Sequence, residues 1–199
     1  MRHQNIAGAI LFIAGVAVIM GITTAEATYP GYSTSQNDIS DLGATRPANS
    51  IIKQPATTIF AATLVVAGVV LIGSPYLVYR GSGSGRVVNI LSTLLALFGI
   101  SAFGVAAFNG STEGSLIIHT LFALLAFVTG GLAAIVSHSV LRPPFRKLLV
   151  VLGIIVLAGL APNVIFGERT PSLRLSVLVK RSAWLSTRPC SGSLALAVT

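Results

Sequence analysis

The sequence predicts an all-α fold, a polytopic transmembrane helix bundle, from three observations. Hydrophobic residues make up 53% of the 199 residues, and charged residues only 9%. A soluble domain carries about a quarter charged residues, because its surface must face water. Five apolar stretches are each long enough to cross a bilayer, which takes about 17–25 residues. The charged residues lie between these stretches rather than within them.

The five expected spans are rich in Leu, Ile, Val, Ala and Gly, and none contains a Lys, Arg, Asp or Glu. They cover residues 6–22, 57–79, 87–108, 116–137 and 148–166. The first span needs a separate argument, because a basic start, an apolar run and Ala25-Glu26-Ala27 also resemble a signal peptide with its cleavage site. Its apolar run of about 17 residues exceeds the usual signal-peptide core of about 7–15, so we expect a retained helix.

Lysine and arginine residues predict the orientation of the spans. Basic residues occur before the first span, between the second and third, and between the fourth and fifth, and the positive-inside rule places these segments in the cytoplasm. We therefore expect a multi-pass protein of the cell membrane with a cytoplasmic N-terminus and with segments 23–56 and 109–115 outside. The basic residues are Arg2, Arg80, Arg86, Arg142, Arg146 and Lys147, and all five acidic residues fall on the outer side.

The strong positive charge does not indicate a nucleic-acid partner. The formal net charge is +8, which on a soluble protein would suggest nucleic acid. Here the basic residues flank apolar spans, so topology accounts for them and membrane lipid is the expected partner. The sequence identifies no protein partner. The single cysteine, Cys190, rules out an internal disulfide.

The longest connection, segment 23–56, carries much of the polar chemistry. Tyr29-Pro30-Gly31 predicts a turn. The side chains of Asp38 and Asp41 can bond their own backbone, and Gly43 is expected to supply a positive φ. At the next outer connection, Asn109-Gly110-Ser111 is formally a glycosylation acceptor, but its place at the membrane face favours a turn.

His119 is the most informative single residue. It lies about one turn inside the fourth span, and an ionisable residue at membrane depth is by default a functional candidate. The alternative is a neutral histidine that bonds a carbonyl or hydroxyl of a neighbouring helix. His138, at the inner end of the same span, is explained by interfacial anchoring.

Acidic residues and His119 are expected at the same outer level of the membrane. Carboxylates and imidazole are ligands for hard or borderline metals, so a divalent metal is one hypothesis, although no signature spacing supports it. Asp38, Asp41 and His119 are also the candidate catalytic residues. The candidate metal ligands are Asp38, Asp41, Glu113, His119 and Glu168.

Small residues at four-residue spacing are expected where helices pack closely. Lipid offers no hydrophobic drive for helix association, so close backbone approach must contribute. The pairs that fit this spacing are Ser92 with Ala96, Ala102 with Ala106, and Gly130 with Ala134.

The character of the chain changes near residue 170, which suggests a transmembrane domain over 1–169 and an atypical basic tail over 170–199. With five spans this tail would lie outside, against the positive-inside bias. Three interpretations stay open: an interfacial segment anchored by Trp184, a disordered tail, or a shifted reading frame that has replaced a sixth helix. On the last interpretation the sixth span is lost or disrupted.

Several motifs together resemble the domain of unknown function 998 family. They are Asp38-Ile39-Ser40-Asp41-Leu42-Gly43, the polar turn from Glu113 to His119, and the Glu168-Arg169 pair. The resemblance covers roughly residues 6–169 and implies a bacterial or archaeal membrane protein, typically with six helices. It therefore implies a sixth helix after Arg169 and leaves the biochemical activity open.

Three functions are compatible with these observations. The first is a non-enzymatic membrane protein that binds lipid or a partner through its outer polar cluster. The second is a membrane-embedded, metal-dependent lipid hydrolase, with Ser40 a remote candidate nucleophile. The third is a small transporter in which His119 and a carboxylate relay protons, although no charged residue lies in mid-span, where a coupling site is expected.

Overall fold

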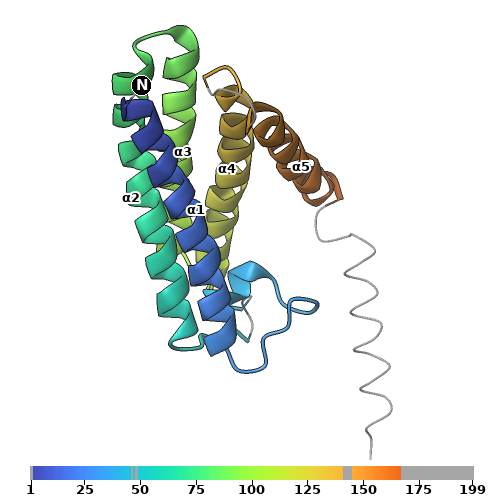
Figure 1. Cartoon of the computed structure of the whole chain (residues 1–199). Coiled ribbons are helices and arrows are strands. Elements are labelled where there is room, and N and C mark those ends of the chain that lie inside the picture. Colours follow the sequence, from blue (N-terminus) through green and yellow to red (C-terminus); the bar gives the residue numbers. More distant parts are fainter. Residues whose placement is uncertain (1, 46, 48, 141–144, 167–199) are drawn as a thin grey trace, which may run out of the picture. The chain divides into compact units, whose positions relative to one another are not determined.

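The computed structural model describes residues 2–45, 47, 49–140 and 145–166. Within this part of the chain every regular element is helical, as expected, and there is no strand. The elements are α1 (Arg2–Thr28), the short 3₁₀ helix η1 (Ile39–Leu42), α2 (Ala56–Ser82), α3 (Arg86–Ala107), α4 (Glu113–Ser137) and α5 (Phe145–Phe166) (Figure 1).

Four of these helices are long and apolar enough to cross a bilayer, which makes the chain a multi-pass membrane protein. They are α1 from Ile6 onward, α2, α3 and α4. α5 forms over the fifth expected span. The expected sixth helix, the tail 170–199 and Glu168 lie outside the described residues.

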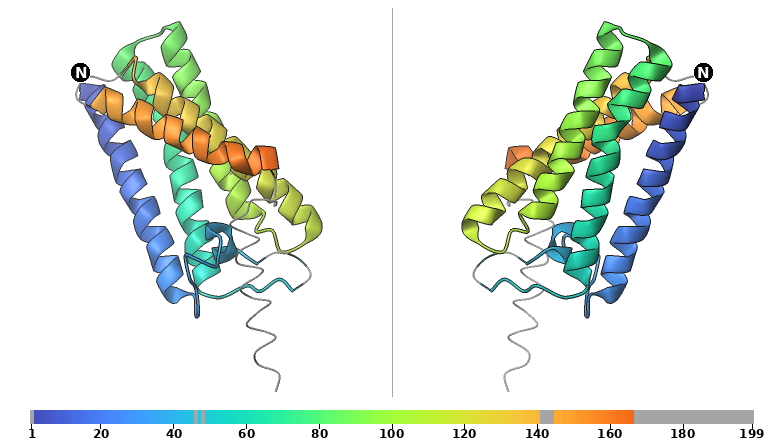
Figure 2. Two further views of the ribbon diagram at one scale, coloured as in Figure 1. Left: turned by 90° about the vertical axis from the view of Figure 1, so that its right-hand side faces the viewer. Right: turned by 90° about the vertical axis from the view of Figure 1, so that its left-hand side faces the viewer.

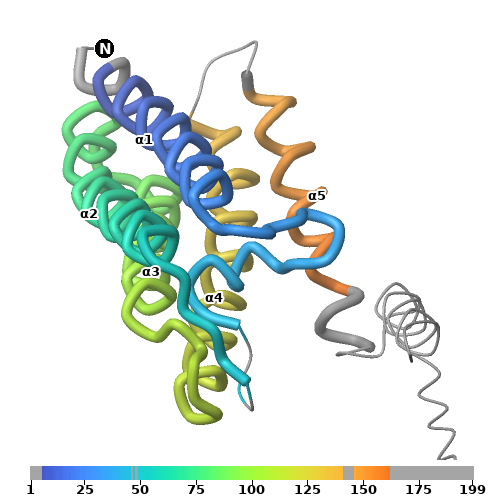
Figure 3. The backbone as a smooth tube through the Cα atoms, turned by 90° about the horizontal axis from the view of Figure 1, so that it is seen from below, coloured from blue at the N-terminus to red at the C-terminus, as the bar shows by residue number. Residues whose placement is uncertain are grey.

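The helices α1 to α4 run alternately up and down, and each packs against the next along the chain (Figures 2 and 3). This alternation places the connections of even and odd helices at opposite ends of the bundle. The end that holds residues 29–55 and 108–112 is called the outer end below. The end that holds residues 83–85 and the start of α5 is called the basic end.

α1 extends beyond the expected span of 6–22. Three threonines continue the helix to Thr28 by donating their hydroxyls to carbonyls one turn earlier; Thr24 Oγ1, for example, lies 2.7 Å from the Met20 carbonyl oxygen. The segment Ala25-Glu26-Ala27 is therefore helical, and Ala25 is fully buried. The first connection begins at Tyr29 rather than at Thr23.

Glycines mark the narrowest helix crossings. A Cβ added to Gly68 of α2 would lie 2.9 Å from the Gly99 carbonyl oxygen of α3, and one added to Gly153 of α5 would lie 2.6 Å from the Gly131 carbonyl oxygen of α4. Such contacts leave no room for a side chain. Of the small residues expected at interfaces, Ser92 and Ala102 are buried, and Gly130 lies beneath the ring of Phe98.

Candidate functional site

Charge divides the molecule into two chemically different ends. The carboxylates of the described chain lie in the last turns of α1, in the connection to α2 and at the start of α4, all at the outer end (Figure 1). The basic end carries Arg80, Arg86, Arg146 and Lys147, which flank the ends of α2, α3 and α5. The candidate residues Asp38, Asp41, Glu113 and His119 therefore belong to the outer end.

Residues 29–55 fold back against the bundle as a structured cap, called the outer cap below; residues 46 and 48 lie outside the description. Leu42 of η1 and Tyr29 are buried in a cluster with Ala25 of α1 and Phe60 of α2. The connection is thus part of the hydrophobic core, and this anchoring presents its polar side chains at defined positions.

Two glycines of the outer cap have different tasks. Gly31 has φ +78°, which accords with the turn predicted at Tyr29-Pro30-Gly31. The expectation that Gly43 supplies a positive φ is wrong, since its φ is −79°. Gly43 is instead buried against α2: an added Cβ would lie 3.5 Å from the Phe60 ring. Its carbonyl also accepts a bond of 3.1 Å from Thr57 Oγ1, which joins the cap to α2.

Asp41 stabilises a turn of the outer cap at residues 37–41, called the acidic turn below. Its carboxylate accepts bonds of 3.1 Å from the Asp38 backbone N–H and 3.2 Å from Asn37 Nδ2. Asn37 Oδ1 in turn accepts from the Ser33 backbone N–H at 3.1 Å. Asp38 is the N-cap residue of η1, a position where aspartate is favoured because helix N-termini carry unpaired N–H groups. The backbone bonding expected for Asp41 is present.

Two tyrosines lie between this acidic turn and the end of α1. The rings of Tyr29 and Tyr32 meet edge to face with centroids 5.7 Å apart. Burial raises the pKa of Tyr29 above its ordinary 10.0, and the Asp41 carboxylate raises it further. For Tyr32, burial again contributes most to the raised pKa, followed by the negative charge of Glu26. In the sequence, Tyr29 indicates only a turn, and Tyr32 gives no signal of a role.

The His119 side chain forms a hydrogen bond with the C-terminal end of α3. It is 7% exposed, and its Nδ1 lies 2.6 Å from the carbonyl oxygen of Phe108, the C-cap residue of α3. A carbonyl can only accept, so Nδ1 carries the proton. The rings of Phe108 and Phe122 stack beside this bond with centroids 5.9 Å apart. This contact is the carbonyl-bonded arrangement that the sequence analysis named as the alternative to a functional histidine.

The turn before α4 is held by its own side chains. Asn109 Oδ1 accepts from the Ser111 backbone N–H at 3.2 Å, and Gly110 adopts φ +78°. Thr112 caps α4 by accepting from the Ser115 backbone N–H at 3.2 Å. The segment thus forms the expected turn, and it places the Phe108 carbonyl within hydrogen-bond distance of His119.

The candidate metal ligands are distributed over two elements. Asp38 and Asp41 belong to the outer cap, whereas Glu113 and His119 belong to the first two turns of α4. Within the residues that the structure describes, no three His, Cys, Asp or Glu side chains come together closely enough to hold a metal ion. Glu168 lies outside those residues, so the metal site stays a prediction.

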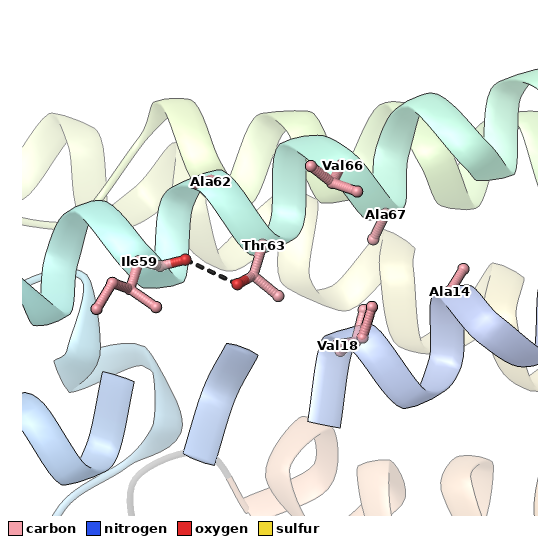
Figure 4. A pocket seen from close by; sticks show the side chains of 8 residues that line it. Ala14, Val18, Ile59, Ala62, Thr63, Val66 and Ala67 are labelled. Carbon is pink, nitrogen blue, oxygen red and sulfur yellow. Dashed lines mark hydrogen bonds between the residues drawn. The ribbon is translucent and has the colours of Figure 1, made fainter. Parts of the chain in front are cut away.

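An apolar groove of about 350 Å³ runs between α1 and α2 (Figure 4). Ala14 and Val18 line it from α1, and Ile59, Thr63 and Ala67 from α2. The Thr63 hydroxyl donates to the Ile59 carbonyl oxygen at 2.7 Å, which satisfies it within its own helix. The groove therefore offers apolar surface and no reactive group.

Comparison with known proteins gives a family and no activity. A family described as a protein of unknown function, DUF998, matches residues 12–187. The match includes α2 to α5 and most of α1, and it continues beyond Arg169, where the motif-based resemblance ended. No curated protein and no solved structure matches the chain.

Proposed function

This chain belongs to the DUF998 family, and from that premise we propose that it is a non-catalytic protein of the cell membrane that binds lipid through its outer cap. The family description assigns no activity, so support must come from the chemistry of the chain itself. The observation that carries the proposal is the way in which the candidate residues are bonded.

Two of the three candidate catalytic residues form hydrogen bonds with backbone groups of the protein itself. Asp41 accepts from the Asp38 N–H, and His119 bonds the Phe108 carbonyl. A general base must be able to reach the proton that it abstracts. Asp41 and His119 instead bond backbone groups, and these bonds stabilise the conformation of the outer end. These bonds support a binding surface more directly than a hydrolytic site.

Exposed apolar side chains of the outer cap support lipid as the ligand. Ile39, Ile51 and Ile52 are 55%, 48% and 47% exposed, next to the polar residues Asp38 and Lys53. Exposed apolar side chains beside charged ones are typical of a segment lying at the headgroup boundary of a bilayer. Carboxylates in the same cap favour a headgroup that carries a positive amine or ammonium group.

The proposed orientation places the outer cap outside the cell and the N-terminus in the cytoplasm. It rests on the lysine and arginine bias of the connections. The metal-dependent hydrolase and the proton-coupled transporter remain the alternatives. The hydrolase needs a metal held by His119 and carboxylates, and the described part of the chain brings no three His, Cys, Asp or Glu side chains together.

Native mass spectrometry of the protein purified in detergent with added phosphatidylcholine tests the proposal. We expect the double variant Ile51→Ser/Ile52→Ser to retain clearly fewer lipid molecules than the parent chain. Val87→Ser is the matched control, because Val87 is a similarly exposed apolar residue at the basic end. Equal lipid retention in all three proteins would contradict the proposal. If the double variant alone lost a co-purifying protein mass, the ligand of the outer cap would be a protein partner and not lipid.

A further inference from the structure

We propose that the basic end of the bundle binds the phosphodiester headgroup of an anionic phospholipid, at a site built around Arg80 and Arg86. These residues lie on either side of the hairpin that joins α2 to α3. The proposal concerns the end opposite the outer cap, so it does not depend on the function proposed above.

The basic end carries positive charge that the described protein does not neutralise. Arg80, Arg86, Arg146 and Lys147 lie at this end, and the described residues place no carboxylate there. The described acidic residues all lie at the outer end. The described protein therefore supplies no negative charge to neutralise these cations, and phosphate groups of the bilayer surface are the anions at the same level.

The side chain of Arg80 is held in a defined orientation. Its Nε donates to Tyr76 Oη at 3.3 Å, and its guanidinium carbon lies 5.4 Å from the centroid of the Tyr76 ring. Stacking and hydrogen bonding together limit the rotamers of a long side chain. The hydrogen bond to Tyr76 involves only Nε of Arg80. The two terminal guanidinium nitrogens can therefore donate to a ligand, and their planar geometry suits two oxygens of one phosphate.

Two exposed tyrosines lie beside Arg80 in the last turns of α2. Tyr76 and Tyr79 are 62% and 39% exposed, and exposed tyrosines collect at the boundary between hydrocarbon and headgroups. Tyr79 Oη donates to Asn89 Oδ1 at 2.9 Å, which links the end of α2 to the start of α3. Arg80 and Arg86 are thereby held at the level where lipid phosphates lie.

The hairpin itself leaves room for a headgroup. Residues 81–85 are glycine and serine only, and Gly83 adopts φ +74°. No side chain in this turn is larger than serine, so none can cover the two arginines. On the neighbouring helices, Arg146 Nε donates to the His138 carbonyl oxygen at 2.8 Å, which orders a third guanidinium.

Native mass spectrometry tests this site with the full-length protein in a nonionic detergent, titrated separately with phosphatidylglycerol and phosphatidylcholine. We expect preferential binding of phosphatidylglycerol, weakened about fivefold by each of Arg80→Gln and Arg86→Gln, since a cation near an anionic surface is worth about 1 kcal/mol. Phosphatidylcholine binding should not change. Lys53→Gln, which removes a cation at the outer end, is the matched control and should leave the phosphatidylglycerol affinity unaltered.

Two further variants separate geometry from charge and from misfolding. Arg80→Lys keeps the charge but removes the planar fork, and Tyr76→Phe keeps the ring but removes the hydroxyl; both should bind phosphatidylglycerol with an intermediate affinity. Helix content by circular dichroism identifies a variant that has not folded, and Arg80→Lys then carries the test. An unchanged phosphatidylglycerol affinity in both Arg80→Gln and Arg86→Gln, or an equal loss of that affinity in Lys53→Gln, would overturn the proposal. Displacement of phosphatidylglycerol by millimolar inorganic phosphate would assign the site to a soluble anion instead.

Discussion

Replacement of His119 by leucine should destabilise the contact between α3 and α4 without abolishing the fold. Leucine retains an apolar side chain of moderate size but removes the donor that lies 2.6 Å from the Phe108 carbonyl oxygen. The carbonyl belongs to a helix C-terminus, where no backbone N–H of the same helix can take the place of the lost donor.

The size of the effect follows from the position of the bond. Leaving a buried acceptor unpaired costs about 1–3 kcal/mol, whereas interhelical hydrogen bonds in a membrane protein average about 0.6 kcal/mol with a maximum of about 1.7. The Phe108 residue is 36% exposed at the outer end, so water can partly replace the histidine. We therefore expect a loss of about 1 kcal/mol in the free energy of unfolding, a roughly fivefold change in the folded-to-unfolded ratio.

The assay is reversible unfolding in mixed micelles, followed by circular dichroism. Two controls isolate the hydrogen bond. His119→Asn places an amide nitrogen near the position of Nδ1 and should recover much of the stability. Thr120→Val alters the exposed neighbouring residue and should change the unfolding free energy by no more than about 0.5 kcal/mol.

Two results would refute this account of His119. One is an unfolding free energy of His119→Leu equal to that of the parent protein, with Asn and Leu equivalent. The other is a divalent metal in the native mass of the parent protein that disappears in His119→Ala. The second result would favour the metal-dependent hydrolase.

Three further predictions concern other parts of the molecule. The pKa of Tyr32 is raised above 10.0. The stability that this tyrosine contributes is therefore complete below about pH 10 and is lost as pH rises through the folded-state pKa. Tyr32→Phe should remove this pH-dependent loss of stability, as measured by tyrosine absorbance and helicity. Gly99→Ala should cost about 1–3 kcal/mol by overpacking the α2–α3 crossing, whereas Gly73→Ala, with nothing within 4 Å of the added Cβ, should be neutral or stabilising in the same unfolding assay. In a chain whose native cysteine is replaced, Ser35→Cys should react with an impermeant thiol reagent on intact cells and Ser84→Cys only after lysis; the reverse pattern would invert the proposed topology.

Much of the architecture follows from the sequence alone. A bilayer requires long, uncharged, internally hydrogen-bonded segments, and this constraint makes the stretches 57–79 and 87–108 recognisable without any knowledge of their neighbours. The end of α1 was missed because the stretch 23–28 contains three threonines and a glutamate. The threonine hydroxyls continue the helix by bonding its own carbonyls. Hydropathy cannot detect that local contribution.

The candidate site depended on contacts that cross from one element to another. The sequence identified His119 and Asp41 as notable residues, but residue type could not tell which carbonyl or N–H group each would bond. Tyr32 gave no signal, because its importance arises from acidic side chains brought near it by the fold.

The sequence by itself therefore determined the class of the protein, its spans, and the separation of charge between the two ends. These properties reflect the cost of placing charge or unpaired backbone in hydrocarbon, which acts on each segment separately. The tertiary structure alone decided that Gly43 packs against Phe60, that Gly68 faces Gly99, and that His119 closes α3. Such contacts depend on the relative placement of backbones to within an ångström, a property that no single segment contains.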